Sequence, residues 1–240
     1  MYEHLFANLC FDEKGGSGIT PIDLILKLWS ISLKTSPLRR AWALLAAYVI
    51  GFYGSFMNRL RIYGVEHIPA RGGVLFAANH ISGYDTIFLP WAVLRACPMQ
   101  MIWAPAKEEL FKNWFLSWLF RSWGAFPVRR GRDLRAGKHL GELLQSEKVM
   151  LFPEGTRNKD GELGKGNRGV GKLIYEHRPA VVPTSLQNLN HWKFPAFGQQ
   201  GRIVFGPPVD FSDLYQKEDC KETHLLIVER LMAAIADGLT

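Results

Sequence analysis

Short apolar runs alternate with longer amphipathic segments along most of the 240-residue chain. Short apolar runs that end at turn residues are typical of buried strands, whereas longer segments with a helical period are typical of helices. Strands are predicted near residues 74–78, 100–104, 125–128, 149–152, 181–186 and 202–205. Helices are predicted at residues 86–95, 108–123, 134–145, 169–176 and 221–239. Because the two types alternate, the predicted fold is α/β, with a layered mixed sheet flanked by helices.

The length of the chain is within the range of one domain, and the sequence has no internal repeat. We expect one main domain over residues 61–240, preceded by an amino-terminal segment over residues 1–60. The three cysteines, Cys10, Cys97 and Cys220, lack paired spacing. This pattern argues against a disulfide framework or a zinc site and fits a reducing cytosol. No metal site is therefore predicted.

The amino-terminal segment contains two apolar stretches that are predicted to be helices. Residues 21–34 carry a helical apolar stripe, residues 41–58 carry no charge, and Ser36 and Pro37 separate them. The two helices could lie in one leaflet of a membrane, as a membrane-associating pair with both ends on the same side. Residues 41–58 could instead span the membrane, although the stretch is short for a span, or pack in a soluble core.

The heptapeptide NHISGYD directly follows the apolar run at residues 74–78. Ser82 and Asp85 fit a helix-start pattern, which places His80 on a turn between a strand and a helix. A carboxylate in the first helical turn can bond one imidazole nitrogen and leave the other nitrogen to accept a proton. His80 is therefore a candidate general base with Asp85 as its partner. The alternative is that Ser82 and Asp85 only cap the helix.

A second motif, FPEGTRN, ends the apolar run at residues 149–152. Pro153 ends the predicted strand and delivers the next four residues to a loop. Arg157 in that loop presents a planar, permanently charged fork that suits a phosphate or a carboxylate. Ligands of α/β sheets collect at the ends of strands, where both motifs are predicted to lie.

With these two motifs the sequence resembles the glycerol-phosphate acyltransferase superfamily. It is most similar to the 1-acyl-sn-glycerol-3-phosphate acyltransferase family, whose signature pairs N-H-x-S-x-x-D with F-P-E-G-T-R. The segment GAFPVRR at residues 124–130 is similar to the family's middle block, and VVPT at residues 181–184 is similar to its last block. The matching region covers residues 64–208, and the family also has a two-helix membrane motif.

The resemblance implies transfer of a fatty acyl group from a thioester donor, either acyl-CoA or an acyl-carrier protein. The acceptor would be the sn-2 hydroxyl of 1-acylglycerol 3-phosphate, and the product would be phosphatidic acid in phospholipid biosynthesis. His80 would act as the general base and Asp85 would orient it, without a covalent acyl-enzyme. The sequence agrees, because it has no G-x-S-x-G elbow to supply a serine nucleophile. Neither a metal nor an organic cofactor is implied.

The resemblance also assigns residues to the lysophospholipid acceptor. Arg157 and Arg130, the arginine of the middle block, would hold its phosphate. The residues that would shape its pocket are Glu154, Gly155 and Thr156. Lys107 matches the family's A-K-x-E-L stretch and could reach the phosphate. Arg129 departs from the pattern, because the family often has an acidic residue there, and it makes the predicted site more cationic.

The formal charge of +7 and the pI near 9.4 indicate an anionic partner. The aromatic residues lie in apolar runs and are not interleaved with basic residues, so a membrane phospholipid surface is favoured and nucleic acid is not. The predicted helix at residues 108–123 would suit the membrane interface, or its apolar side would pack on the sheet. The predicted location is the cytoplasmic face of the cell membrane, with monotopic or peripheral attachment.

Two other functions remain open from the sequence. The first is the same chemistry on glycerol 3-phosphate or on another lysolipid, such as lyso-ornithine lipid, because the superfamily shares these motifs. The second is a catalytically silent lipid-binding protein, which the intact pair of His80 and Asp85 disfavours.

Overall fold

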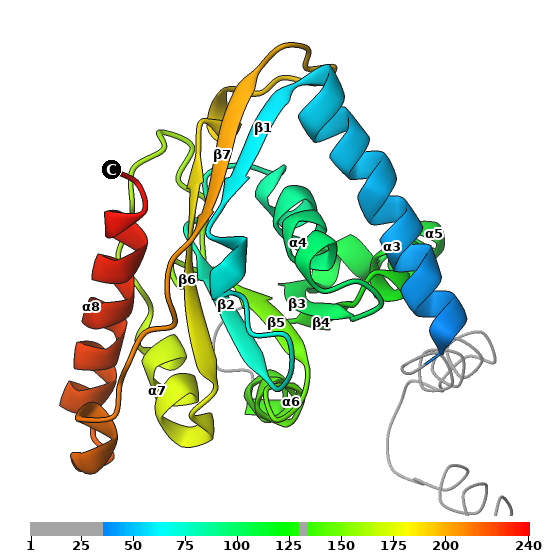
Figure 1. Ribbon diagram of the computed structural model, residues 1–240. Helices are drawn as coiled ribbons and strands as arrows, with labels where there is room; N and C mark the ends of the chain where they lie inside the picture. Colours follow the sequence, from blue (N-terminus) through cyan, green and yellow to red (C-terminus); the bar gives the residue numbers. More distant parts are fainter. Residues whose placement is uncertain (1–35, 130–133) are drawn as a thin grey trace, which may run out of the picture. The chain divides into compact units, whose positions relative to one another are not determined.

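The computed structural model describes residues 36–129 and 134–240, which form a seven-stranded sheet flanked by helices (Figure 1). The strand order is β1-β7-β6-β2-β5-β3-β4. β6 and β7 are antiparallel, and the other neighbouring pairs are parallel. The sheet is therefore mixed, which confirms the predicted α/β class. The predicted helix at residues 21–34 and the predicted site residue Arg130 lie outside the described residues.

All six predicted strands are present, with small shifts at their ends. The strands are β1 (Arg59–Tyr63), β2 (Val74–Ala78), β3 (Ile102–Lys107), β4 (Ala125–Val128), β5 (Lys148–Leu151), β6 (Ala180–Gln187) and β7 (Gln200–Phe205). The sequence prediction omits β1, the edge strand beside β7. Its sequence, RLRIY, alternates exposed and more buried positions, with Leu60 inside and Arg59 and Arg61 outside. This alternation is itself a strand signal.

The helices follow the predicted order, with one correction. They are α3 (Pro37–Phe52), α4 (Asp85–Ala96), α5 (Trp114–Ser122), α6 (Leu134–Leu143), α7 (Arg168–His177) and α8 (Lys221–Asp237). The single helix predicted at residues 108–123 is wrong, because a 3-10 turn at Glu108–Phe111 precedes a separate α5. Asn113 makes the break, since its side chain accepts hydrogen bonds from the N–H groups of Phe115 and Leu116. Asparagine is among the preferred residues at this capping position.

Alternate residues of β2 face opposite sides of the sheet and enter two separate cores. Val74, Phe76 and Ala78 pack with α4, whereas Leu75 and Ala77 pack with α6, α7 and α8. All five residues of β2 are buried. Parallel strands covered by helices on both faces are buried in this way, which explains why β2 reads as a continuous apolar run.

α3 packs on α4 through a row of small residues at four-residue intervals. Ala43, Ala47 and Gly51 are buried along this side. A Cβ on Gly51 would lie 1.9 Å from Nε1 of Trp91 on α4, so glycine permits the close approach of the two helices. At the other end of α3, Arg39 Nε donates to the carbonyl oxygen of Ser122 at 3.1 Å, and burial lowers the pKa of this arginine. α3 thus belongs to the same compact unit as the sheet, while the domain division at residue 60 stays a prediction.

The opposite side of α3 is apolar and exposed. Residues on this side recur at alternating intervals of four and three, which keeps them on one side of a helix. We call them the α3 stripe: Leu38, Trp42, Leu45, Val49 and Phe52. A π-helical turn at Tyr53–Met57 extends the helix toward β1. None of the helices in residues 36–129 and 134–240 has the length and apolarity that crossing a bilayer requires.

Candidate active site

Both predicted motifs follow strands that are neighbours in the middle of the sheet. β2 ends at Ala78 and leads into NHISGYD, and β5 ends at Leu151 and leads into FPEGTRN. The two strands are parallel and paired, so their carboxyl ends lie at the same edge of the sheet. From β2 the chain passes to α4 on one side of the sheet, and from β5 it passes to α7 on the other. Such a switch point is where α/β proteins bind their ligands.

Asp85 orients the His80 imidazole as the sequence predicts. Nδ1 of His80 lies 2.8 Å from Oδ2 of Asp85, the first residue of α4. The carboxylate is fully buried, and the His80 side chain is 13% exposed. An ionised carboxylate only accepts hydrogen bonds, so Nδ1 carries the proton and Nε2 presents its lone pair. None of the described residues bonds Nε2, and the imidazole can therefore take a proton from a bound molecule.

The same carboxylate oxygen also caps the helix. Oδ2 of Asp85 accepts hydrogen bonds from the N–H groups of Ile81 at 2.7 Å and Ser82 at 2.6 Å. The sequence left open whether Asp85 caps the helix or bonds the histidine. In the structure one oxygen atom, Oδ2 of Asp85, does both. Burial raises the pKa of Tyr84, the residue before Asp85, to about 12.

The second motif packs directly against the first. The His80 ring stacks on the ring of Phe152, with centroids 4.0 Å apart and planes 14° from parallel. The N–H of Asn158 donates to the carbonyl oxygen of His80 at 2.8 Å. A Cβ built on Gly83 would lie 3.9 Å from both terminal nitrogens of Arg157. The guanidinium therefore lies beside the loop that carries the imidazole, and the two motifs form one site.

The carboxylate of Glu154 connects the two motifs. Its Oε1 accepts a hydrogen bond from the N–H of His80 at 2.9 Å. Its Oε2 accepts from the N–H of Gly164 at 3.0 Å and from Nδ2 of Asn158 at 2.5 Å. Both oxygens are thus used within the protein. Any effect of Glu154 on an acceptor pocket would therefore be indirect.

The loop after Glu154 turns sharply and then becomes exposed. Gly155 has a φ of 69°, a backbone conformation that favours glycine, and its N–H donates to the carbonyl oxygen of Phe152 at 3.0 Å. Thr156 and Arg157 follow with exposed side chains. The turn therefore places a cationic side chain in solvent at the carboxyl edge of the sheet, next to His80.

The remaining predicted cations follow the neighbouring strands β3 and β4. Lys107 is the exposed last residue of β3 and is in register with Val128, the last residue of β4. Arg129 comes next, and its Nε lies 2.9 Å from Oε2 of Glu108. Lys107 therefore lies at the same edge of the sheet as His80. Arg130 lies outside the described residues, and its role stays a prediction.

Asn79 is a site residue that the sequence interpretation missed. Its Nδ2 donates to the carbonyl oxygen of Leu186 at 2.9 Å, and its Oδ1 accepts from the N–H of Leu186 at 2.7 Å. The side chain is fully buried and ties the first motif to the end of β6. A signal was available, because an amide directly after a buried apolar run must find partners for its polar atoms.

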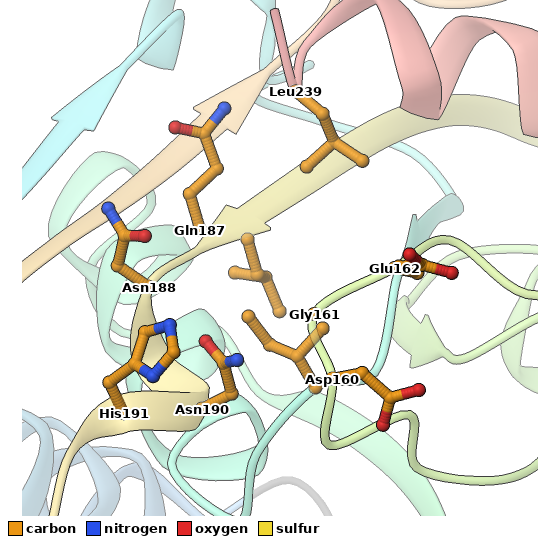
Figure 2. A pocket seen from close by; sticks show the side chains of 10 residues that line it. Asp160, Gly161, Glu162, Gln187, Asn188, Asn190, His191 and Leu239 are labelled. Carbon is orange, nitrogen blue, oxygen red and sulfur yellow. The ribbon is translucent and has the colours of Figure 1, made fainter.

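A separate pocket of about 360 Å³ lies beside the loop that follows β2. Figure 2 shows it between the end of β6 with the turn that follows, the loop at residues 160–162, and Leu239. Ile81 lines it, whereas His80 and Arg157 do not. In the part of the chain that the structure describes, no group of three or more His, Cys, Asp or Glu side chains is placed to hold a metal ion.

A histidine oriented by a buried carboxylate, with an arginine beside it, suits an enzyme that activates a hydroxyl of an anionic substrate for group transfer. The particular family follows from the sequence. The sequence model of the acyltransferase family matches residues 59–187, just over half of the chain, and the chain belongs to this family. The matched region contains both motifs, and the match confirms the resemblance described above.

Relatives agree with this placement, and a solved structure shares the fold. The chain is 26% identical over 139 residues to the 1-acyl-sn-glycerol-3-phosphate acyltransferase of Borreliella burgdorferi, covering 56% of this chain and 53% of that protein. It is 28% identical over 169 residues to the enzyme of the same name from Bacillus subtilis, covering 68% and 82%. The crystal structure of the 1-acyl-sn-glycerophosphate (LPA) acyltransferase PlsC from Thermotoga maritima has a similar fold. Its TM-score is 0.55 at 21% identity, covering 89% of this chain and 95% of that one. The chain thus spans about half the length of the first relative and most of the second.

Proposed function

We propose that the chain transfers a fatty acyl group from a thioester, either acyl-CoA or an acyl-carrier protein, to the sn-2 hydroxyl of 1-acylglycerol 3-phosphate. The observation that carries this proposal is the placement of the Asp85-oriented His80 imidazole and the Arg157 guanidinium on adjoining loops. The imidazole suits a hydroxyl, and the guanidinium suits a phosphate. A lysophosphatidic acid carries a hydroxyl and a phosphate on one glycerol backbone. The names of the relatives support the same acceptor.

The reaction needs one proton acceptor and no protein nucleophile. Nε2 of His80 takes the proton of the acceptor hydroxyl. At the same time the hydroxyl oxygen attacks the carbonyl carbon of the thioester. The tetrahedral intermediate then breaks its carbon–sulfur bond, and the departing thiolate takes the proton from the imidazolium. The products are phosphatidic acid and a free thiol. A base positioned at hydrogen-bond distance contributes about 10²- to 10⁴-fold, and binding both substrates together supplies much of the rest. The proposal includes no metal or organic cofactor.

The rival acceptors are glycerol 3-phosphate and other lysolipids, including lyso-ornithine lipid. A catalytically silent lipid-binding protein is the rival from another class. The direct bond between His80 and Asp85 speaks against the silent protein, because a binding site needs no oriented base. The Arg157 guanidinium beside Gly83 suits an anionic head group. A lyso-ornithine lipid also carries a carboxylate, so the assay below separates it from 1-acylglycerol 3-phosphate.

One assay separates these functions. Purified protein is offered glycerol 3-phosphate and a panel of lysolipids, each with acyl-CoA and with acylated carrier protein. We expect phosphatidic acid from 1-acylglycerol 3-phosphate as the main product. Preferred acylation of another acceptor would contradict the proposed substrate, and binding of lipid without any product would favour the silent protein.

Replacing Arg157 with alanine is expected to raise the KM for 1-acylglycerol 3-phosphate about 10- to 100-fold. Loss of a charge-assisted hydrogen bond to a phosphate typically has this effect, whereas kcat should change less. Steady-state kinetics at saturating donor measures both constants. The control is Arg71→Ala, because Arg71 is also an exposed arginine. It lies before the amino end of β2, whereas Arg157 lies after the carboxyl end of β5. An unchanged acceptor KM in Arg157→Ala would show that Arg157 does not bind the phosphate.

We also propose that the protein works at the cytoplasmic face of the cell membrane, attached as a monotopic or peripheral protein. The supporting observation is the α3 stripe, an exposed apolar side on a helix whose other side is already packed on α4. A helix that is apolar on its exposed side as well as on its packed side needs a second apolar environment. Sedimentation of purified protein with phospholipid vesicles tests the membrane attachment, and protein that remains in the supernatant at every lipid concentration would contradict it.

A further inference from the structure

Four large apolar side chains project into solvent where α3 approaches β7. Phe56 and Met57 belong to the π-helical turn after α3, and Phe194 and Phe197 belong to the segment before β7. Phe194 is 83% exposed, Phe56 78%, Phe197 59% and Met57 40%. We call these four residues the aromatic tip. Large side chains exposed as a group mark an interaction site, whereas scattered ones do not.

Hydrogen bonds hold the aromatic tip on a fixed base. Asn58 Nδ2 donates to the carbonyl oxygen of Ala196 at 2.9 Å, and the N–H of Ala196 donates to Oη of Tyr53 at 2.7 Å. The N–H of Gly198 donates to the carbonyl oxygen of Met57 at 2.9 Å. Asn58 and Ala196 are themselves buried. The two halves of the tip therefore form one unit, and binding through it requires little ordering of the chain.

The aromatic tip continues the α3 stripe. The ring of Phe56 stacks on the ring of Phe52, the last residue of the stripe, with centroids 4.8 Å apart. The ring of Phe194 lies 6.3 Å from that of Tyr53. Figure 1 shows the segment before β7 beside the carboxyl-terminal end of α3. The apolar surface proposed above for the membrane thus extends from α3 onto a second part of the chain.

The segments that form this surface carry positive charge alone. Residues 37–65 and 177–209 contain no aspartate or glutamate, although the chain has 22 acidic residues in all. The exposed cations in and beside the aromatic tip are Lys193, Arg59, Arg61 and Arg202. Arg61 and Arg202 are register partners on β1 and β7. Each such cation near an anionic lipid surface strengthens binding about fivefold.

This charge pattern distinguishes a lipid surface from a second copy of the chain. A two-fold dimer would place the same patch on both sides of the contact, so its cations would face each other and repel. Anionic phospholipid instead offers apolar chains to the rings and negative head groups to the arginines and the lysine. Aromatic residues with neighbouring cations suit the interface of such a bilayer.

We propose that the aromatic tip inserts into an anionic phospholipid bilayer as a second membrane contact, in addition to α3. Arg202, near the start of β7, is in register with Gln187, the last residue of β6, and β6 is parallel to β2. The start of β7 and the end of β2 therefore lie at the same edge of the sheet. The tip, which comes just before β7, and His80, which comes just after β2, are both at this edge. Inserting the tip turns this edge toward the lipid that holds the acceptor. The inference rests on the proposed membrane function, but its test measures binding alone.

The test is sedimentation of the full-length protein with vesicles of phosphatidylcholine, and with vesicles of equal parts phosphatidylcholine and phosphatidylglycerol. Replacing Phe194 and Phe197 together with serine is expected to weaken binding to the mixed vesicles about tenfold. The matched control replaces Leu225 and Leu226 with serine, because both are exposed on α8. Replacing Arg59 and Lys193 with glutamine is expected to weaken binding to the mixed vesicles about fivefold per charge and to leave phosphatidylcholine binding unchanged.

Unfolding temperatures and light scattering accompany each binding curve. Wild-type affinity in a folded Phe194→Ser, Phe197→Ser variant would overturn the proposal, and so would an equal loss of binding in the α8 control. A tip variant that dissociates from dimer to monomer with unchanged vesicle binding would identify a contact between copies instead, which also overturns it. Acylation of detergent-dispersed substrate should be the same in the tip variant and the wild type. Failure of the wild type in that assay would count against the proposed enzyme and not against the tip.

Discussion

His80→Ala is expected to lower acyl transfer to 1-acylglycerol 3-phosphate by at least about 100-fold. The imidazole is the group that the structure orients to accept a proton, and removing a positioned base costs about 10²- to 10⁴-fold. The loss should appear in kcat, while the KM of the acceptor should stay near its wild-type value, because the alanine variant keeps Arg157. Release of free thiol from the acyl donor, measured at saturating acceptor, follows the reaction directly.

His139→Ala is the matched control for this variant. Nδ1 of His139 lies 3.8 Å from Oε2 of Glu142 on α6, so the control also removes a histidine next to a carboxylate. Glu142 is exposed, and His139 is half-buried with its ring against that of Phe126. Both lie within α6 and not in a loop that follows a strand. We expect its turnover to equal that of the wild type. Normal turnover in a folded His80→Ala protein would remove the base from the mechanism.

Much of this site was predictable because its signals are local. An apolar run followed by His80 and Asp85 specifies a strand, a turn and a helix start, and the run before Glu154 specifies a second strand and loop. Ligands of α/β sheets collect at the ends of strands, so both loops were predicted to lie at one ligand site. The structure pairs β2 with β5 and brings Arg157 beside Gly83 in this way.

The features that the sequence did not reveal depend on partners far along the chain. β1 is short and at the edge of the sheet, and its partner β7 comes much later in the chain. The hydrogen bonds of Asn79 to Leu186 likewise require that β6 lie beside β2. The start of α5 is different, because Asn113 is a local cap signal that the apolar periodicity on either side concealed. Tertiary contacts, and one overlooked cap, therefore account for the differences.

Glu154→Gln is expected to reduce kcat about 10- to 100-fold with little change in the KM of the acceptor. The wild-type carboxylate only accepts hydrogen bonds, and three donors from His80, Asn158 and Gly164 point at it. A glutamine keeps the shape, but its NH₂ group would face at least one of these donors. The loop that carries the imidazole would then shift, and small displacements of a catalytic group cost this much in rate. Steady-state kinetics separates kcat from KM.

Glu162→Gln provides the comparison, because it makes the same chemical change on an exposed side chain of the loop between Asn158 and Gly164. We expect wild-type kinetics from it. If Glu154 bound the acceptor directly, the result for Glu154→Gln would be the opposite. The KM of the acceptor would rise and kcat would change little. The position of the Glu154 carboxylate argues against that role, because both of its oxygens are already bonded to the chain. A pure KM effect in Glu154→Gln would therefore show that these bonds rearrange when the acceptor binds, and that Glu154 is a ligand of the substrate and does not position His80.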